Sequence, residues 1–235
     1  RGEALARKAR ELQLQVEQAR AIVESLGQLK GAAMKAGQLL SMELRDILPP
    51  EVIEVLSRLQ ASGATVAFEA IDGVLLEELG PARRAELEVV PRPLASASIG
   101  QVHRATWRPP DGSPVDLALK VQFRGIAETI DSDLALLQRI ARLFLGAQRK
   151  ALDLAPVFAE LEEVLKQETD YLHEAGVLER YRALAHRVPG LRVPAVHHPL
   201  CTRRVLALSH EAGLTLDAWL AQVVPLLSEK LTVEA

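Results

Sequence analysis

The stretch PLASASIGQVHRA, residues 93–105, is the part of this sequence that decides the fold. It places four small residues ahead of a strand-like segment: Ala95, Ser96, Ala97 and Ser98. Small side chains let backbone N–H groups approach phosphate oxygens, and serine hydroxyls add further donors. Only Gly100 freely adopts a positive φ here, so we expect a loop stiffer than a glycine-rich one. The alternative is an ordinary hairpin connection.

A lysine follows this stretch, at the end of LALK (117–120). The pattern of residues 115–122 predicts a strand in which Lys120 shares a face with Ala118. An ammonium group in such an apolar segment is desolvated and needs a carboxylate or phosphate partner. Lys120 is therefore a candidate phosphate-binding residue, and the alternative is an edge-strand lysine that points to water.

Residues 155–185 predict one long helix with three acidic candidates, Glu168, Asp170 and Glu174. The apolar stripe of this helix contains Leu161, Leu165, Leu172 and Ala175. At this spacing the stripe should also include position 168, where the sequence has Glu168 instead of an apolar residue. A carboxylate on a buried stripe needs a fixed cationic partner. At about 100° per residue, Asp170 and Glu174 project close together, whereas Glu168 points about 120° away from Glu174. We expect Glu174 to pair with Lys120 and Glu168 to pair with a lysine of another element; the alternative is that both are solvated.

Lys35 is the candidate partner of Glu168, and it lies in KAGQ (35–38) within a predicted helix over 3–45. Small residues surround it and would allow another element to approach closely: Gly27, Gly31, Ala32, Ala33, Ala36 and Gly37. Gln38 is three residues on and so shares the face of Lys35. If the pair is buried, Lys35→Ala should lower the free energy of unfolding by about 1–3 kcal/mol or more. The alternative for Lys35 is an ordinary surface position.

The whole pattern predicts an α+β fold. Helices are expected at 3–45, 51–60 and 68–79, followed by strands at 86–91, 101–107 and 115–122 with a hairpin turn at 109–112. Further helices are expected at 126–147, at 155–185 and from Leu216, with short strands near 195–198 and 203–210. The expected division is a helical N-terminal extension (1–80), a sheet-containing domain with inserted helices (81–213) and the start of a further domain (214–235).

The composition excludes several classes of function. The formal net charge is −3 over 235 residues, which gives no general attraction to nucleic acid or to anionic lipid. The single cysteine, Cys201, excludes an internal disulfide and a multi-cysteine zinc site, and the six histidines show no ligand spacing. No apolar run reaches about 18 residues, so we expect no transmembrane segment. The chain begins with Arg1 rather than Met, and we expect it to be part of a longer protein.

The chain resembles the UbiB-type atypical kinases, a family linked to ubiquinone biosynthesis. The matching segments occur in the family's order along nearly the whole chain: KAGQ (35–38), LPPEVIEVLSRLQ (48–60), PLASASIGQVHRA (93–105), DGSPVDLALKVQFRG (111–125), QETDYLHEA (167–175) and, more loosely, VLALSHEAG (205–213). The resemblance implies a protein-kinase-like N-lobe with a helical N-terminal extension whose KxGQ segment lies over the active site. It also implies that the C-lobe is largely absent from this chain.

The resemblance also implies a role for each candidate residue. Lys35 and Gln38 would lie in the inhibitory segment, Lys120 would bind the ATP phosphates, and Glu174 would be its ion-pair partner. Glu168 and Asp170 match the family's ExD motif. The loop Ala95 to Ser98 would replace the glycine loop of protein kinases. The hinge would be Leu208–Gly213, where Leu208 and His210 would contact adenine through backbone groups.

The sequence departs from the family in three places. The loop has ASAS where the family usually has AAAS, and Ser209 stands where the hinge usually has an acidic residue. The catalytic-loop Asp and Asn and the DFG-type Asp are not found, and the last aspartate is Asp217. Phosphoryl transfer needs metal ions and a residue that positions the nucleophile. We therefore expect the Mg²⁺ ligands to lie outside this chain, and no ATP turnover by this chain alone.

The function implied by the resemblance is ATP binding with Mg²⁺ and ATP hydrolysis, in support of isoprenoid quinone biosynthesis. The expected partners are membrane-associated quinone-biosynthesis proteins or lipid intermediates, and not nucleic acid. The expected location is cytoplasmic, with peripheral attachment at the inner face of the membrane left open. Two alternatives are a non-catalytic pseudokinase and a helical scaffold that binds nucleotide or a partner without turnover.

Overall fold

The computed structural model describes residues 35–36, 39, 65–147 and 155–222. Lys35, Ala36 and Leu39 are helical. The rest of the expected helix over 3–45, the expected helix over 51–60, and Gln38 lie outside the described residues. The expected α+β fold is confirmed, because the described ranges combine helices with one antiparallel sheet.

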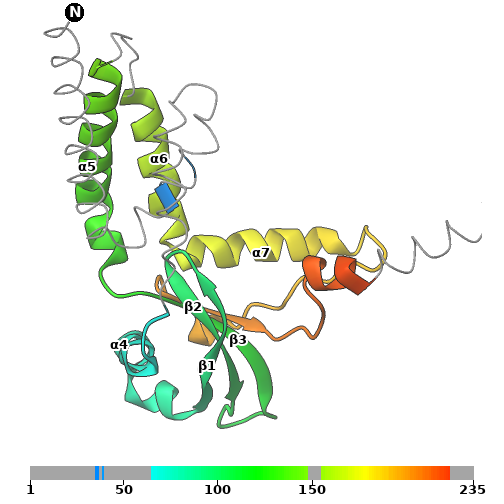
Figure 1. The fold of residues 1–235 in the computed structure, drawn as a ribbon. Helices are drawn as coiled ribbons and strands as arrows, with labels where there is room; N and C mark the ends of the chain where they lie inside the picture. Colours follow the sequence, from blue (N-terminus) through cyan, green and yellow to red (C-terminus); the bar gives the residue numbers. More distant parts are fainter. Residues whose placement is uncertain (1–34, 37–38, 40–64, 148–154, 223–235) are drawn as a thin grey trace, which may run out of the picture.

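The centre of this fold is a four-stranded antiparallel sheet (Figure 1). Its strands follow the order β1 (Leu87–Ala97), β2 (Gly100–Trp107), β3 (Val115–Gln122) and β4 (Val205–Ser209). β1 is longer than the strand expected over 86–91, because residues 93–97 continue to pair with β2 beyond two irregularities in register around Pro93. Ala95, Ser96 and Ala97 are therefore strand residues rather than a loop, and only Ser98 and Ile99 form the turn.

The strand expected over 195–198 is reduced to a single bridge between Val196 and Leu208. Pro194 and Pro199 bracket this segment, and neither has an N–H that could extend the ladder. Pro199 lies instead in η1 (His198–Leu200), a short 3-10 helix. The last expected strand, over 203–210, is confirmed as β4 with slightly shorter bounds.

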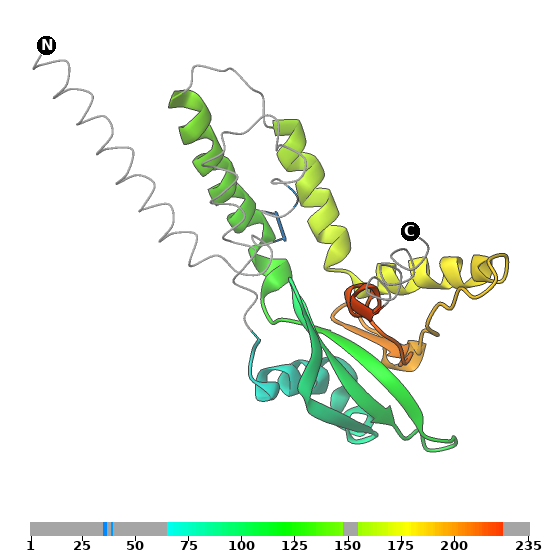
Figure 2. The same cartoon turned by 45° about the vertical axis from the view of Figure 1, so that its right-hand side comes forward.

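The described residues form four long helices besides the sheet: α4 (Phe68–Ala85), α5 (Ile126–Ala147), α6 (Ala155–Glu168) and α7 (Tyr171–Ala185). Figures 1 and 2 show α4 and α7 on opposite sides of the sheet, and α5 and α6 side by side, extending away from it. α4 bends at Gly80, which has a φ of 75° and precedes Pro81. The domain boundary expected at residue 80 falls at this bend, inside a helix that packs on the sheet; the division into 1–80 and 81–213 stays a prediction.

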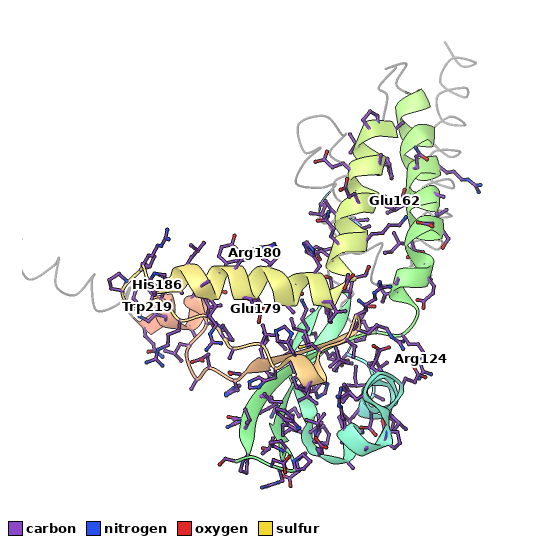
Figure 3. The ribbon with its side chains drawn as sticks, turned by 180° about the vertical axis from the view of Figure 1, so that it is seen from behind. Arg124, Glu162, Glu179, Arg180, His186 and Trp219 are labelled. Carbon is purple, nitrogen blue, oxygen red and sulfur yellow. The ribbon has the colours of Figure 1, made fainter. Side chains whose placement is uncertain are left out.

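The prediction of a single helix over 155–185 is wrong, because the structure has two helices in this range. α6 ends at Glu168 and α7 begins at Tyr171, with Asp170 as the N-cap of α7 in an extended conformation (φ −105°, ψ 94°). The Leu172 N–H donates to the Asp170 carboxylate at 3.0 Å, which satisfies one of the free donors at the helix start. Figure 3 shows the resulting corner from behind, with Glu162 on α6 and Glu179 and Arg180 on α7.

Alternation along β3 assigns its two faces. Leu117, Leu119 and Val121 are fully buried in an apolar cluster with α4 residues such as Leu75. The next residues in the alternation, Ala118 and Lys120, therefore face the opposite side of the sheet, where α7 lies (Figure 1). The pleat thus places Lys120 on the side of the sheet that contains the candidate acidic residues.

A second apolar cluster lies on this side of the sheet, among α5, α6 and α7. It includes Ile130, Leu161, Leu165 and Ala175, together with Ala36 from the N-terminal helical segment. Ala36 is fully buried, so the residue next to Lys35 is packed against the helices that surround the candidate site. Within the ranges described, no helix is long and apolar enough to cross a membrane.

Charged contacts join α4 to the start of β4. The Arg204 guanidinium donates to Glu78 Oε1 at 2.8 Å and to Glu77 Oε2 at 3.2 Å. Burial alone would raise the pKa of the Glu78 carboxyl, but hydrogen bonds from Thr202 and Arg204 outweigh burial and hold this pKa below its ordinary value of 4.5. These contacts join α4 to the segment that begins β4, which pairs with β3 beside Lys120.

Candidate functional site

Lys120 and Glu174 form an ion pair between β3 and α7. The Lys120 ammonium donates to Glu174 Oε2 at 2.6 Å, across 54 residues of sequence. About a quarter of the Lys120 side chain (25%) and 38% of the Glu174 side chain are exposed, so the pair is accessible from one side. The structure thus brings together the two residues that the sequence proposed as partners, and it leaves ammonium protons free for a further anionic ligand.

The pair lies at the wall of a pocket of about 540 Å³. Residues from β1, the turn, β3, α6 and α7 line it together with one from the N-terminal helical segment: Lys35, Ala97, Ser98, Ile99, Lys120, Val164, Gln167, Glu168, His173, Glu174 and Val177. A volume of this order is typical of small-ligand sites. Ala97 and Ser98 from the proposed loop line the pocket, whereas Ala95 and Ser96 lie further back in β1, paired with β2.

Gly100 begins β2 directly after the turn. A glycine is needed here because a side chain would not fit, and not because the backbone adopts a positive φ. Its φ is not positive; the positive-φ glycines in the described residues are Gly80, Gly125 and Gly190. A Cβ on Gly100 would lie only 2.4 Å from the Val121 carbonyl oxygen. Gly100 therefore does not use the positive φ that a glycine permits, and its role is to let the turn lie directly against β3.

Tyr171 is a site residue that sequence reasoning missed. Its side chain is fully buried, and its ring centroid lies 4.6 Å from the Lys120 ammonium. Burial, with smaller contributions from the negative charges of Glu174 and Glu168, raises the pKa of the Tyr171 hydroxyl, so this hydroxyl stays protonated at neutral pH. The available signal was its position in QETDYLHEA, in a chain with only two tyrosines.

Lys35 and Glu168 form a second ion pair at the same pocket. The Lys35 ammonium lies 3.0 Å from Glu168 Oε1, and the exposed fractions of the two side chains are 21% and 38%. Glu168 is therefore half-buried at the end of α6, and the continuous stripe from which it was predicted does not exist, since Leu172 is 46% exposed. The two pairs are separated because Glu168 and Glu174 lie on two helices, and not because they point apart on one.

Asp170 does not lie among the residues that line this pocket. Its carboxylate caps α7, and Oδ2 lies 3.9 Å from the exposed Arg203 guanidinium. Asp170 and Glu174 therefore have different partners, although the Glu174 N–H donates to the Asp170 carbonyl oxygen at 3.3 Å. The aspartate in this motif instead begins a new helix, and this lets α7 direct Glu174 toward β3.

Leu208 and His210, the proposed hinge contacts, lie at the other end of β4. Leu208 pairs with Ala118 and packs against the apolar cluster on the α7 side. The His210 N–H donates to the Asp116 carbonyl oxygen at 3.0 Å, and the His210 ring nitrogen Nδ1 lies 3.3 Å from Asp116 Oδ2. A contact of His210 with adenine would therefore use its carbonyl oxygen rather than its N–H. Neither residue lines the pocket that contains Lys120.

The chemistry of the pocket suits an anionic ligand better than a metal ion. Two ammonium groups, from Lys35 and Lys120, face it, and each is paired with one carboxylate. Among the described residues, no group of three or more His, Cys, Asp or Glu side chains is arranged to hold a metal ion. A phosphate group suits the Lys120 side of the pocket because an ammonium donates to anionic oxygens, while ATP binding and the location of the Mg²⁺ ligands stay predictions.

Comparison with known proteins supports the assignment made from the motifs. Residues 58–223 match the family model described as the ABC1 atypical kinase-like domain. The atypical kinase COQ8B, mitochondrial, of Rattus norvegicus is 36% identical over 204 residues, covering 83% of this chain and 36% of that protein. The atypical kinase COQ8, mitochondrial, of Saccharomyces cerevisiae is 34% identical over 194 residues, covering 82% of this chain and 38% of that protein. The chain thus spans little more than a third of the length of these relatives.

A solved structure shows the same fold. The complex of Rv3197 with erythromycin from Mycobacterium tuberculosis matches with a TM-score of 0.54 and 29% sequence identity, covering 90% of this chain and 53% of that one. Together, the family match over most of the sheet-containing part and this structural match agree with the α+β arrangement expected of a kinase N-lobe. The chain therefore belongs to the ABC1 atypical kinase-like family, the UbiB-type family that its motifs predict.

Proposed function

We propose that this chain is the ATP-binding part of an atypical kinase that hydrolyses ATP. The observation that supports this most directly is the 2.6 Å Lys120–Glu174 pair beside the Ser98–Ile99 turn, in one pocket. In this arrangement Glu174 fixes the ammonium while the ammonium contacts phosphate oxygens, and the turn lies close enough to add hydroxyl and backbone donors. Bound ATP would supply the transferable phosphoryl group, with Mg²⁺ held by residues outside the described part.

Water is a better acceptor for this pocket than a protein side chain. Lys35 and Glu168 line the same pocket as Lys120 and are joined at an N···O distance of 3.0 Å. The buried Ala36 holds this segment in place, so an extended peptide would have to displace it to reach the phosphates. We therefore propose ATP hydrolysis in preference to protein phosphorylation.

The biological role that we propose is support of isoprenoid quinone biosynthesis. The motifs resemble the UbiB-type family, and two relatives are named as mitochondrial COQ8 atypical kinases. The substrates of that pathway are lipids, so the intact protein would act at a membrane surface, as a peripheral protein. Membrane-associated biosynthetic proteins or lipid intermediates would then be its partners.

The proposal is tested by nucleotide binding to the intact protein. We expect ATP with Mg²⁺ to bind in isothermal titration calorimetry, and Lys120→Met to weaken binding by about tenfold or more, since a charge-assisted contact is lost. Lys166→Met is the matched control, because Lys166 is an exposed lysine of α6 paired with Asp131 and Glu162 outside this pocket. Phosphate release measured on the same samples separates hydrolysis from binding alone.

Three results would contradict the proposal. ATP binding without phosphate release would favour the pseudokinase. Absence of ATP binding would favour the helical scaffold. Equal ATP affinity of the wild type and Lys120→Met would show that this pocket is not the nucleotide site.

A further inference from the structure

Tyr171 contacts both halves of the candidate phosphate site. Its ring centroid lies 4.6 Å from the Lys120 ammonium, a distance at which a cation is attracted to the face of an aromatic ring. At its other end, the hydroxyl oxygen would be 3.1 Å from a Cβ placed on Gly100, so it lies directly against the residue that follows the turn. The Tyr171 N–H donates to the Arg203 carbonyl oxygen at 3.1 Å, which fixes the start of α7.

The Tyr171 hydroxyl has no hydrogen-bond partner among the described residues, although its oxygen is buried. A buried hydroxyl without a partner is unfavourable compared with the hydrogen of phenylalanine. Apolar packing alone would therefore favour phenylalanine at this position. The ring, by contrast, has a clear use, because the ammonium that it contacts is also the one that Glu174 holds.

We propose that Tyr171 is a positioning residue for phosphate binding, an inference that rests on the proposed function. Its ring contacts the same Lys120 ammonium that Glu174 holds. The other end of the side chain lies against Gly100, the residue after the Ser98–Ile99 turn, so one rigid ring spans from the lysine to the start of β2. Tyr171 thus keeps the Lys120 ammonium and the turn at a spacing at which both can contact the same phosphates. It does so without touching the ligand, since it does not line the pocket.

The experiment compares MgADP with adenosine, each titrated into the intact protein by calorimetry. Tyr171→Leu should weaken MgADP binding by about tenfold, the effect of a partly desolvated cation–π contact, and should leave adenosine affinity unchanged. Tyr171→Phe keeps the ring and should bind MgADP within about threefold of the wild type. Tyr181→Leu is the matched control, because Tyr181 lies on the same helix with 63% of its side chain exposed, and this change should have no effect.

A double-mutant cycle with Lys120→Met separates positioning from packing. If Tyr171 acts through Lys120, Tyr171→Leu should weaken MgADP binding no further when Lys120 is already methionine. Should Tyr171→Leu fail to fold, Tyr171→Met takes its place in the cycle, since methionine fills the volume without an aromatic face.

The inference is overturned if Tyr171→Leu weakens MgADP and adenosine equally, if its effect adds in full to that of Lys120→Met, or if MgADP affinity does not change. Its failure is distinct from that of the proposed function. MgADP binding that depends on Lys120 but not on Tyr171 refutes this inference alone, whereas wild-type protein without Lys120-dependent binding refutes both.

Discussion

Replacing Lys35 with methionine tests the ion pair that brings the N-terminal helical segment to the pocket. The substitution keeps the aliphatic stem of the side chain and removes only the charge, so apolar contacts of the stem are preserved. Glu168→Gln removes the partner charge with little change in shape. The two single variants and the double variant form a cycle that isolates the interaction between the two side chains.

The structure predicts a weaker Lys35–Glu168 interaction than the sequence pattern did. A buried stripe position predicted a loss of about 1–3 kcal/mol or more on removing Lys35. The pair has an N···O distance of 3.0 Å, but 21% of the Lys35 side chain and 38% of the Glu168 side chain are exposed. A carboxylate left alone there would be hydrated, so we expect a coupling energy of about 0.5–1 kcal/mol, near the upper end for exposed ion pairs.

The assay is urea denaturation of the intact protein at low and high salt. Urea is preferred because guanidinium would screen the charges under study. The coupling energy should fall when NaCl rises from about 0.1 to about 1 M, because the Debye length shortens from about 10 to about 3 Å. The pair Arg108–Glu88, which is 55% and 64% exposed, is a comparison in which we expect a weaker coupling at both salt concentrations.

Two outcomes would refute this reasoning. A coupling energy of about 3 kcal/mol or more, insensitive to salt, would mean that Glu168 is buried as its sequence pattern suggested. No measurable coupling at low salt would mean that the two side chains do not interact, and that the packing of Ala36 alone holds the segment at the pocket.

Three further predictions concern the elements that frame the site. Gly100→Ala should lower the free energy of unfolding by about 1–3 kcal/mol, because its Cβ would lie 2.4 Å from the Val121 carbonyl oxygen; an unchanged urea midpoint would contradict this. Asp170→Ala should lower it by about 1 kcal/mol through loss of the α7 cap, and Asp170→Asn should retain most of the stability; equal thermal midpoints for the two variants would show that capping is not the cause. The pKa of Glu78 is held below 4.5, so its contribution to stability is complete above about pH 4.5 and is lost as pH falls through the lower folded-state value. Glu78→Gln should therefore destabilise the protein at pH 7 and flatten the decline in stability below pH 4.5, and a parallel decline for both proteins would exclude the proposed origin.

Local pattern was sufficient for much of the fold. The period of two in β3 and its bounds at 115–122 were predicted correctly, and with them the face that Lys120 shares with Ala118. The helix over 126–147 was also predicted with the bounds that the structure shows for α5. These features depend on residues a few positions apart, whose side chains share a face whenever the backbone is regular.

The helix corner at Asp170 was not predictable from periodicity alone. Residues 155–185 contain a glycine only at Gly176 and one proline near the start, Pro156, so nothing in the sequence forces a break at Thr169. The break is stabilised by contacts outside the helix: Gln122, 47 residues away, donates to the Thr169 carbonyl oxygen at 3.0 Å. Asp170 was the available signal as a favoured N-cap residue, but its N3 position is His173 and not the Glu or Gln of a capping box.

The sequence by itself determined the family, the sheet that presents Lys120, and the identity of the charged residues that meet in the pocket. Only the tertiary structure decided how those residues meet: Glu168 is half-buried at a helix end, Gly100 leaves room for the Val121 carbonyl oxygen, and Tyr171 contacts Lys120 and lies against Gly100. The physical reason is the sequence distance over which each feature is determined. Periodicity records which face of its own element a residue occupies, whereas burial and the Lys120–Tyr171 contact depend on how segments about fifty residues apart pack against each other.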